Sequence, residues 1–202
     1  MSIDFFALFF ILIGYLLGSI SFAVVISKAM GLADPHTYGS GNPGATNVLR
    51  SGNKVAALLT LLGDALKGWL AVSLARHWGP LYGIDVQGGL LEGVGLAAFI
   101  GHVFPLFHRF AGGKGVATAL GVLLGVNSMV GIVTLVTWGA VAYLFRYSSL
   151  AAIIAAICAP IYYLLIVGRY IPAAIIALMS LFLIVRHKQN IKNLLSGTES
   201  RF

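Results

Sequence analysis

Long apolar stretches separated by short polar gaps dominate this chain. A membrane-spanning helix needs about 17–25 apolar residues. The apolar stretches that we assign to membrane-spanning helices are 4–27, 55–75, 89–107, 116–145, 149–167 and 171–185. The stretch 116–145 is too long for one span and carries Asn127-Ser128 near its middle, so it predicts two short helices joined by a tight turn. The pattern therefore predicts an all-α polytopic membrane protein with seven transmembrane helices, forming one domain over residues 1–202.

Composition agrees with a membrane protein. The chain is 59% hydrophobic and 9% charged, with a mean hydropathy of +0.95, whereas soluble domains carry about 25% charged residues. The net charge of +7 is spread along the chain and forms no basic block, which argues against nucleic-acid binding. The single cysteine, Cys158, lies in an apolar run and has no partner for an internal disulfide.

The distribution of lysine and arginine predicts the orientation. Seven spans place the two termini on opposite sides of the membrane, and cations collect on the cytoplasmic side. With the N-terminus outside, Arg76 and Arg169 lie outside, and Lys67 lies within a span. The inner segments then carry Lys28, Arg50, Lys54, Arg109, Lys114, Arg146, Arg186, Lys188, Lys192 and Arg201. This bias predicts a cytoplasmic C-terminus and puts both glycine-rich gaps on the cytoplasmic face.

The first glycine-rich gap reads GSGNPGATNVLR over residues 39–50. Glycines there permit positive φ, so main-chain N–H groups can face an anion. Short polar side chains add donors, and an arginine adds a planar fork that matches phosphate. The alternative is an ordinary turn. The candidate binding residues are Gly39, Ser40, Gly41, Asn42, Thr46, Asn47 and Arg50.

The second gap reads GHVFPLFHRFAGGKGVAT over residues 101–118. Gly112, Gly113 and Gly115 surround Lys114, which resembles a phosphate cradle, but a Walker A loop needs Ser or Thr where Gly115 stands. A helix that begins at residue 116 would direct its N-terminus at the anion. His102 is either a general base or a hydrogen-bonded structural histidine, and the sequence leaves both open.

The basic tail RHKQNIKNLLSGTES, residues 186–200, follows the last span. His187 and Asn190 share a helix face, although a solvated basic helix would look the same. We expect Glu199 to pair with a neighbouring cation. Ser149 lies at the start of another span on the same membrane face.

Asp64 and Lys67 are three residues apart within a predicted span. At this spacing on a helix they can form an ion pair, and ionisable residues inside a membrane are functional suspects. We expect this pair to support the site and not to react itself.

The chemistry that the motifs offer is anion binding with backbone donors. No Cys/His cluster is present, so we predict no metal, and we predict no other cofactor. Without a G-x-S-x-G elbow, an acyl-enzyme is poorly supported. Catalysis by positioning and oxyanion stabilisation fits better. A small anion transporter is an alternative, but it should show an internal repeat, and none is evident. A purely structural membrane subunit would leave both glycine loops unexplained.

The three motifs GSGNPGATN, GHVFPLFHRFAGGKGVAT and RHKQNI with its Gly-Thr-Glu sequel resemble the PlsY family. These are bacterial acyl-phosphate:glycerol-3-phosphate acyltransferases, and the resemblance covers nearly the whole chain. It implies seven spans in the inner membrane with the active site facing the cytoplasm. It also implies acyl transfer from acyl-phosphate to the 1-hydroxyl of glycerol 3-phosphate, which yields lysophosphatidic acid for phospholipid synthesis.

The resemblance also assigns residues. Ser40, Arg50, Lys114, His187 and Asn190 match functional motif positions, and the glycines around the lysine match a glycerol-3-phosphate loop. Ser149 matches a serine after the fifth span, with Ser148 as the competing alignment. Direct transfer needs a base for the hydroxyl proton, and His102, His187 and a substrate phosphate all stay open, with the phosphate favoured. A soluble enzyme that forms acyl-phosphate is the partner implied upstream, and the acyl chain adjoins membrane lipid.

Overall fold

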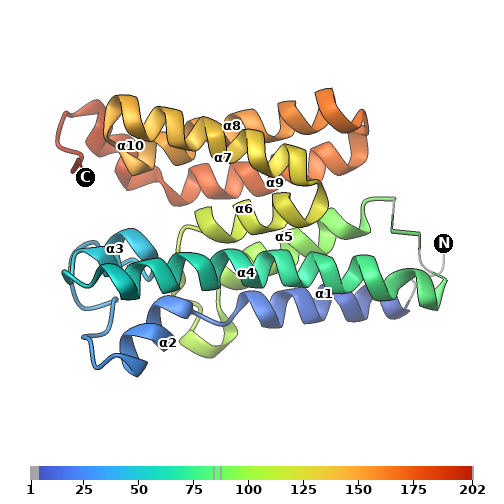
Figure 1. The fold of residues 1–202 in the computed structure, drawn as a ribbon, viewed down its shortest axis with the longest axis horizontal. Coiled ribbons are helices and arrows are strands. Elements are labelled where there is room, and N and C mark those ends of the chain that lie inside the picture. Colours follow the sequence, from blue (N-terminus) through green and yellow to red (C-terminus); the bar gives the residue numbers. More distant parts are fainter. Residues whose placement is uncertain (1–4, 84, 87, 202) are drawn as a thin grey trace.

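The computed structural model describes residues 5–83, 85–86 and 88–201, and this part of the chain is helical without a strand. Figure 1 shows long helices lying side by side along one axis. The α-helices are α1 (Phe5–Gly18), α2 (Phe22–Ala29), α3 (Ala45–Leu49), α4 (Lys54–Trp78), α5 (Leu90–Val103), α6 (Val116–Val126), α7 (Ser128–Phe145), α8 (Ser148–Val167), α9 (Tyr170–Arg186) and α10 (Lys188–Leu195). Two short 3₁₀ helices follow α4 and α5, η1 (Gly79–Tyr82) and η2 (Leu106–His108).

The core forms where α4 packs against α1, α5 and α6, and a second layer forms where α8 packs against α7 and α9. Small residues allow the closest approaches. A Cβ at Gly18 would clash with the carbonyl of Ala98 on α5, and one at Gly121 would clash with the carbonyl of Ala65 on α4. Many leucine and aromatic side chains remain exposed on the outside of the bundle, as expected for a lipid-facing surface.

The membrane-spanning helices match the hydropathy pattern in part. Within the described residues, four helices are long and apolar enough to cross a membrane: α4 with η1, α5 with η2, α7 and α8. Two bent pairs, α1 with α2 and α9 with α10, could each provide one more. The two helices expected in 116–145 are confirmed, because Asn127 ends α6 and its side chain accepts a hydrogen bond from Val130 N at the start of α7. With 11 residues, α6 is only about 16 Å long, about half of the hydrocarbon thickness.

The span expected over 4–27 is not one continuous helix. Residue 4 lies outside the described residues, and the segment divides into α1 and α2, bent by 41°. The hydroxyl of Ser19 donates to the carbonyl of Tyr15, and the carbonyl of Ile20 accepts from Lys67 Nζ at 2.6 Å. Lys67 thereby satisfies a backbone carbonyl at the break, which hydropathy alone does not report.

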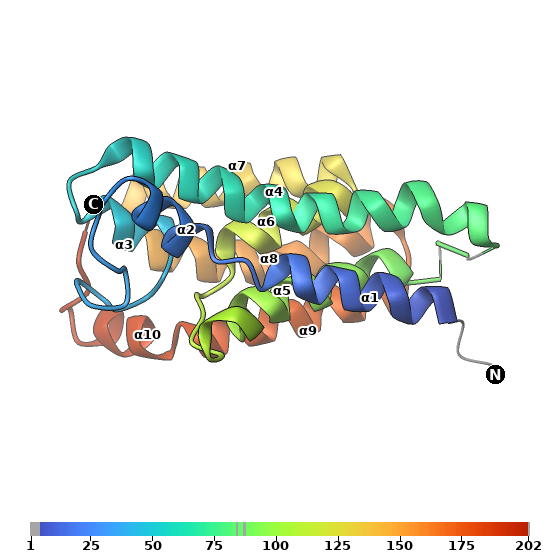
Figure 2. The same ribbon diagram turned by 90° about the horizontal axis from the view of Figure 1, so that it is seen from below.

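The two chain ends lie at opposite ends of the bundle. In Figures 1 and 2, α2, α3, α10 and the C-terminus gather at one end, whereas the chain starts at the other. The two glycine-rich loops and the tail therefore meet at one end of the helices, and this end is called the loop end below.

Candidate active site

A cavity of about 710 Å³ opens at the loop end and reaches between the helices. Its mouth is polar and its inner part is apolar. The motif residues that line it are Ser40, Asn42, Thr46, Asn47, Arg50, His102, Lys114, Gly115, Ser149, His187 and Asn190. Four residues expected at the site, Gly39, Gly41, Gly112 and Gly113, do not line the cavity and instead shape the loops around it.

A chain of hydrogen bonds joins three distant segments across the mouth. Lys114 Nζ donates to Asn190 Oδ1 at 2.6 Å, and Asn190 Nδ2 donates to Glu199 Oε1 at 2.7 Å. The Ser149 hydroxyl donates to the same carboxylate oxygen at 2.5 Å. Glu199 was expected to pair with a cation, but it binds an amide and a hydroxyl instead. It therefore ties the tail to α8 and orients the amide that meets Lys114.

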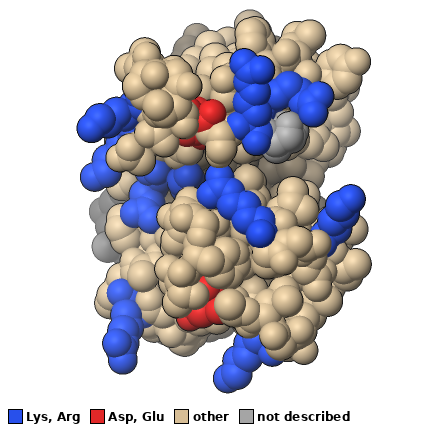
Figure 3. All heavy atoms as spheres, turned by 90° about the vertical axis from the view of Figure 1, so that its left-hand side faces the viewer, with Lys and Arg blue, Asp and Glu red and all other residues tan. Residues whose placement is uncertain are grey.

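Positive charge dominates the mouth. Figure 3 looks onto the loop end and shows more lysine and arginine than acidic side chains. Arg50 Nη2 donates to the Ser200 hydroxyl at 2.8 Å, which brings the first loop to the tail. Burial lowers the pKa of Lys114, and nearby Arg50 and Arg186 lower it further, whereas Glu199 partly offsets them. Crowded cations of this kind favour an anionic ligand.

His187 is a buried neutral histidine. It lies between α9 and α10, with 2% of its surface exposed. Burial lowers its pKa to about 4, and the neighbouring Lys114 acts in the same direction. Its Nδ1 lies 2.8 Å from the carbonyl oxygen of Leu183, which can only accept, so Nδ1 carries the proton. The other ring nitrogen, Nε2, is then left with its lone pair.

Asn47 organises the first glycine loop. Its Oδ1 accepts from the backbone N of Ser40 at 2.9 Å and from the Ser40 hydroxyl at 3.2 Å. Its Nδ2 donates to the carbonyls of Pro35 and Tyr38 at 2.8 and 3.1 Å. Gly39 has φ +59°, and a Cβ there would clash with Asn47 Oδ1. The amide is engaged by the protein, so Asn47 shapes the loop that presents Ser40.

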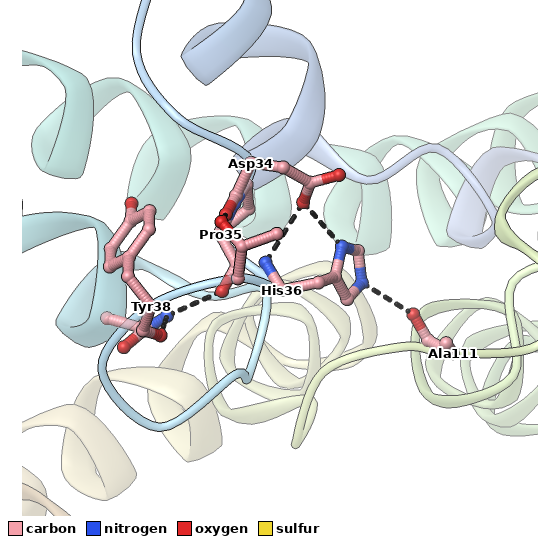
Figure 4. A network of polar contacts seen from close by, with 7 residues as sticks. Asp34, Pro35, His36, Tyr38 and Ala111 are labelled. Atoms are coloured by element: carbon pink, nitrogen blue, oxygen red, sulfur yellow. Dashed lines mark hydrogen bonds and ion pairs between the residues drawn. The ribbon is translucent and has the colours of Figure 1, made fainter.

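The two glycine loops are joined by a histidine that the motifs did not single out. Figure 4 shows His36 between Asp34 and Ala111. Asp34 Oδ1 accepts from the backbone N of His36 at 2.9 Å and lies 2.7 Å from Nδ1, while Nε2 lies 3.0 Å from the carbonyl of Ala111. The backbone hydrogen bond from His36 is the main cause that lowers the pKa of Asp34. The only signal for this contact in the sequence was Asp34, one of the six acidic residues of the chain.

Glycine is required where the second loop passes behind Lys114. Gly113 N donates to the carbonyl of His102 at 3.1 Å, and a Cβ at Gly113 would clash with the His102 ring. Gly115 begins α6 with φ +86°, where a Cβ would clash with the Phe99 ring. Arg186 Nη2 donates to the carbonyl of Gly112 at 2.9 Å. The loop is thus held from both sides, with the N-terminus of α6 facing the cavity.

The expected pairing of Asp64 and Lys67 is confirmed, with 2.9 Å between Asp64 Oδ1 and Lys67 Nζ. His102 joins this pair, because its Nδ1 lies 3.0 Å from the same Nζ. All three side chains are buried, and Asp64 and His102 reach the cavity wall. The cluster lies at the junction of the polar mouth and the helices.

The inner part of the cavity is an apolar arm. It is walled by leucines of α6, alanines of α8 and part of α7. Those residues are Leu120, Leu123, Leu124, Trp138, Ala152, Ala155, Ala156 and Ala159. Ala159 lies ten residues beyond Ser149 on α8, about 15 Å along the helix. A polar anion site and an apolar slot long enough for part of a fatty chain therefore share one cavity.

Known proteins are similar to this chain in sequence and fold. The chain matches the family model described as glycerol-3-phosphate acyltransferase over residues 8–197. It is 62% identical over 194 residues to the glycerol-3-phosphate acyltransferase of Cupriavidus pinatubonensis, covering 96% of this chain and 95% of the relative. The glycerol-3-phosphate acyltransferase of Ralstonia nicotianae is also 62% identical, over 192 residues, covering 95% and 92%.

Two solved structures have the same architecture. Both are crystal structures of PlsY (YgiH), an integral membrane glycerol 3-phosphate acyltransferase, and both cover 97% of this chain and 95% of the solved chain. The glycerol 3-phosphate form has a TM-score of 0.88 at 39% identity, and the lysophosphatidic acid form has a TM-score of 0.86 at 38% identity. With its cationic mouth, apolar arm and match along nearly the whole length, this chain belongs to the glycerol-3-phosphate acyltransferase family and is an integral membrane acyltransferase.

Proposed function

We propose that this acyltransferase moves a fatty acyl group from acyl-phosphate to the 1-hydroxyl of glycerol 3-phosphate and so forms lysophosphatidic acid. The observation that carries the proposal is the single cavity in which Lys114 and Arg50 at the mouth adjoin the apolar arm. A soluble phosphate and an aliphatic donor can meet only where both environments touch.

The phosphate of glycerol 3-phosphate binds at the mouth. Lys114 supplies charge, Arg50 supplies a planar fork, and Asn42 and Thr46 add neutral donors from the cavity wall. The N-terminus of α6 at Gly115 adds its dipole. The similarity of this chain to PlsY, whose crystal structure is known in a glycerol 3-phosphate form, supports this assignment.

The acyl chain lies in the apolar arm with its carbonyl at the polar boundary. The alanines of α8 leave the space, and apolar contact there contributes about 0.8 kcal/mol for each methylene buried. The lysophosphatidic acid form of PlsY supports a cavity that also accepts the product.

The transfer is direct, without an acyl-enzyme. The glycerol 1-hydroxyl oxygen attacks the carbonyl carbon, a C–O ester bond forms, and the carbonyl C–O bond to phosphate breaks. The hydroxyl proton leaves with the inorganic phosphate. Acyl-phosphate is an activated mixed anhydride, so the protein needs only to align the reactants and neutralise their charge.

The geometry favours substrate phosphate as the base. His187 has a free Nε2, but a pKa of about 4 makes it a weak acceptor of protons at neutral pH. The Nδ1 of His102 faces Lys67 and not the cavity. A phosphate monoester has a second pKa near 6, closer to working pH. His187 and Asn190 then serve to bind and orient, with Asn190 steering Lys114.

We further propose seven membrane-embedded segments in one domain, residues 1–202. They are the α1–α2 pair, α4, α5, α6, α7, α8 and α9, with the short α6 enclosed by its neighbours. The N-terminus faces outward and the loop end faces the cytoplasm in the bacterial inner membrane. The ten cations assigned to the inner segments support this orientation, and it lets a soluble enzyme deliver acyl-phosphate from the cytoplasm.

The test is an assay of the purified protein in detergent with labelled glycerol 3-phosphate. Palmitoyl-phosphate should give labelled lysophosphatidic acid, and palmitoyl thioesters should give none. Intact mass after exposure to palmitoyl-phosphate alone should show an unmodified chain. Product from the thioester but not from the phosphate would refute the donor, and a stable acylated protein that transfers its acyl group would refute direct transfer.

A further inference from the structure

Three buried ionisable side chains form a cluster behind the cavity mouth. Asp64 and Lys67 belong to α4 and His102 belongs to α5, and none exposes more than 6% of its side chain. Charged groups in the interior of a membrane protein are costly unless the protein surrounds them with partners. The neighbours of these three side chains therefore indicate which segments the cluster holds in place.

Lys67 is the centre of the cluster. Its Nζ lies 2.9 Å from Asp64 Oδ1, 3.0 Å from His102 Nδ1 and 2.6 Å from the carbonyl oxygen of Ile20. An ammonium group has three N–H donors and no acceptor. The carbonyl of Ile20 and Nδ1 of His102 are hydrogen-bond partners of this ammonium group, and the Asp64 carboxylate forms an ion pair with it. Because Ile20 lies between α1 and α2, Lys67 also fixes the bend that leads into the first glycine loop.

This geometry decides the tautomer of His102. A proton on Nδ1 would point at the Lys67 ammonium, which cannot accept it. The alternative acceptor for that proton, Asp64 Oδ1, lies 3.5 Å from Nδ1, beyond the usual range for a good N–H···O bond. Nδ1 is therefore an acceptor, and the neutral ring carries its proton on Nε2.

The same histidine contacts the loop that carries Lys114. Its backbone carbonyl accepts from Gly113 N at 3.1 Å, and its Nε2 edge lies so close to Gly113 that a Cβ there would clash. A Cβ at Gly112 would clash with the His102 carbonyl. Both the ring and the main chain of His102 thus form the surface against which Gly112 and Gly113 lie.

We propose that Lys67, paired with Asp64, holds His102 as the tautomer protonated on Nε2, and that this fixed ring positions the loop of Gly112, Gly113 and Lys114. Asp64, Lys67 and His102 are then positioning residues, and the reaction depends on them through the place of Lys114 Nζ. The expected effect on the reaction rests on the proposed role of Lys114 in binding phosphate. The assignment of the His102 tautomer does not depend on that role.

The tautomer is tested on the unmodified protein. Nitrogen NMR of imidazole-labelled protein in detergent, with His102→Gln to assign the signal, should show a protonated Nε2 and a bare Nδ1 for His102 at neutral pH. A ring protonated on Nδ1, or on both nitrogens, would overturn the first half of the proposal. This result does not depend on any substrate, so it stands apart from failure of the proposed function.

The positioning role is tested with His102→Asn. The asparagine oxygen can replace Nδ1 as the acceptor for Lys67, but the Nε2 edge that supports Gly113 is lost. We expect near-normal thermal stability and a kcat/KM for glycerol 3-phosphate lowered about 10- to 100-fold, mainly through KM, because displacement of about 1 Å in a binding group has effects of this size. Normal KM and kcat in the folded variant would overturn the second half.

The role of Lys67 is tested by comparing its substitution by methionine with the same substitution at Lys54, an exposed lysine on the same helix. Lys54→Met should keep both kinetic constants. Lys67→Met, combined with Asp64→Asn so that no lone charge stays buried, should raise KM for glycerol 3-phosphate and change the nitrogen spectrum of His102. An unchanged spectrum in the folded double variant would show that Lys67 does not set the tautomer.

Discussion

The two ends of the helix bundle both hold buried polar groups, but they use them differently. At the end opposite the loops, the Tyr163 hydroxyl donates to Glu92 Oε1 at 2.7 Å, joining α8 to α5. Arg76 Nη2 donates to the carbonyls of Gly125 and Val126 at 2.7 and 2.5 Å, which caps the end of α6. These side chains belong to helices, and their hydrogen bonds join those helices to other helices.

At the loop end, the polar side chains come from loops and the tail and converge on a cavity of about 710 Å³. Lys114, Asn190 and Glu199 form a chain across its mouth, and Arg50 flanks it. The difference teaches that a polar residue inside a membrane bundle is not by itself a sign of function. Convergence from distant segments onto an open space is the sign that separates the two ends.

The largest effect should come from removing the cations at the mouth. Lys114→Ala and Arg50→Ala should each lower acyl transfer by about 10³-fold or more, since each removes charge that the phosphates need. Lys28→Ala, an exposed cation beside the same end, should keep its activity. The measurement is initial rate with glycerol 3-phosphate in detergent, with thermal melts to show that each variant is folded. Normal turnover in the Lys114 and Arg50 variants would refute the site.

A smaller effect should separate two glycines with the same backbone angle. Gly115 has φ +86° at the loop end and Gly52 has φ +85° in the turn before α4. An alanine at either position pays about 1–2 kcal/mol for positive φ. A Cβ at Gly115 also clashes with Phe99, whereas a Cβ at Gly52 has nothing within 4 Å.

We therefore expect Gly115→Ala to lower kcat/KM about 10- to 100-fold, because the start of α6 must shift away from the cavity. Gly52→Ala should lose only stability. Rates and melting temperatures measured side by side decide this. Equal losses of activity in the two variants would mean that backbone strain, and not the shape of the cavity, is what matters.

Most of the fold was accessible from sequence because hydrophobic runs in a membrane have few structural solutions. The turn at Asn127, the long helices and the Asp64–Lys67 pair all follow from local pattern. Both glycine loops and the tail were also identified, and the structure brings them to one cavity. The common cationic face predicted this convergence.

The features that could not be predicted from the sequence depend on contacts between distant segments. The bend after α1 needs Lys67, 47 residues away, to satisfy the carbonyl of Ile20. The role of Glu199 depends on Ser149, 50 residues away, and that of His36 depends on Ala111 in the other loop. Asn47 looked like a ligand-binding amide, but its hydrogen bonds go to its own loop. Local pattern identifies polar residues and does not assign their partners.

The third effect is a pH dependence that belongs to the loop end. His187 has a pKa of about 4 in the folded protein, against 6.5 for an ordinary histidine. Between these values the unfolded chain binds the extra proton and the folded chain does not. The contribution of His187 to the free energy of unfolding is therefore fully present above pH 6.5. It falls as the pH drops towards 4, by about 3 kcal/mol in total.

His187→Gln should remove this loss. Thermal melts of both proteins in detergent from pH 7 to pH 4 should show the wild-type midpoint falling further than that of the variant, by about 10 °C for a chain of this size. Gly52→Ala serves as the control and should follow the wild-type slope, because it removes no partner of an ionisable group. Parallel slopes for His187→Gln and wild type would mean that His187 protonates in place.

The smallest effect should come from the far end. Tyr163→Phe removes the hydroxyl that donates to the buried Glu92 and leaves the shape of the ring unchanged. An unsatisfied buried acceptor costs about 1–3 kcal/mol, so the melting temperature should fall by several degrees. Activity at a temperature well below the melt should stay at the wild-type value, because this pair lies far from the cavity mouth and does not line it. A selective rise in KM for glycerol 3-phosphate in Tyr163→Phe would mean that the two ends are coupled through α5 and α8, and the separation drawn between them would fail.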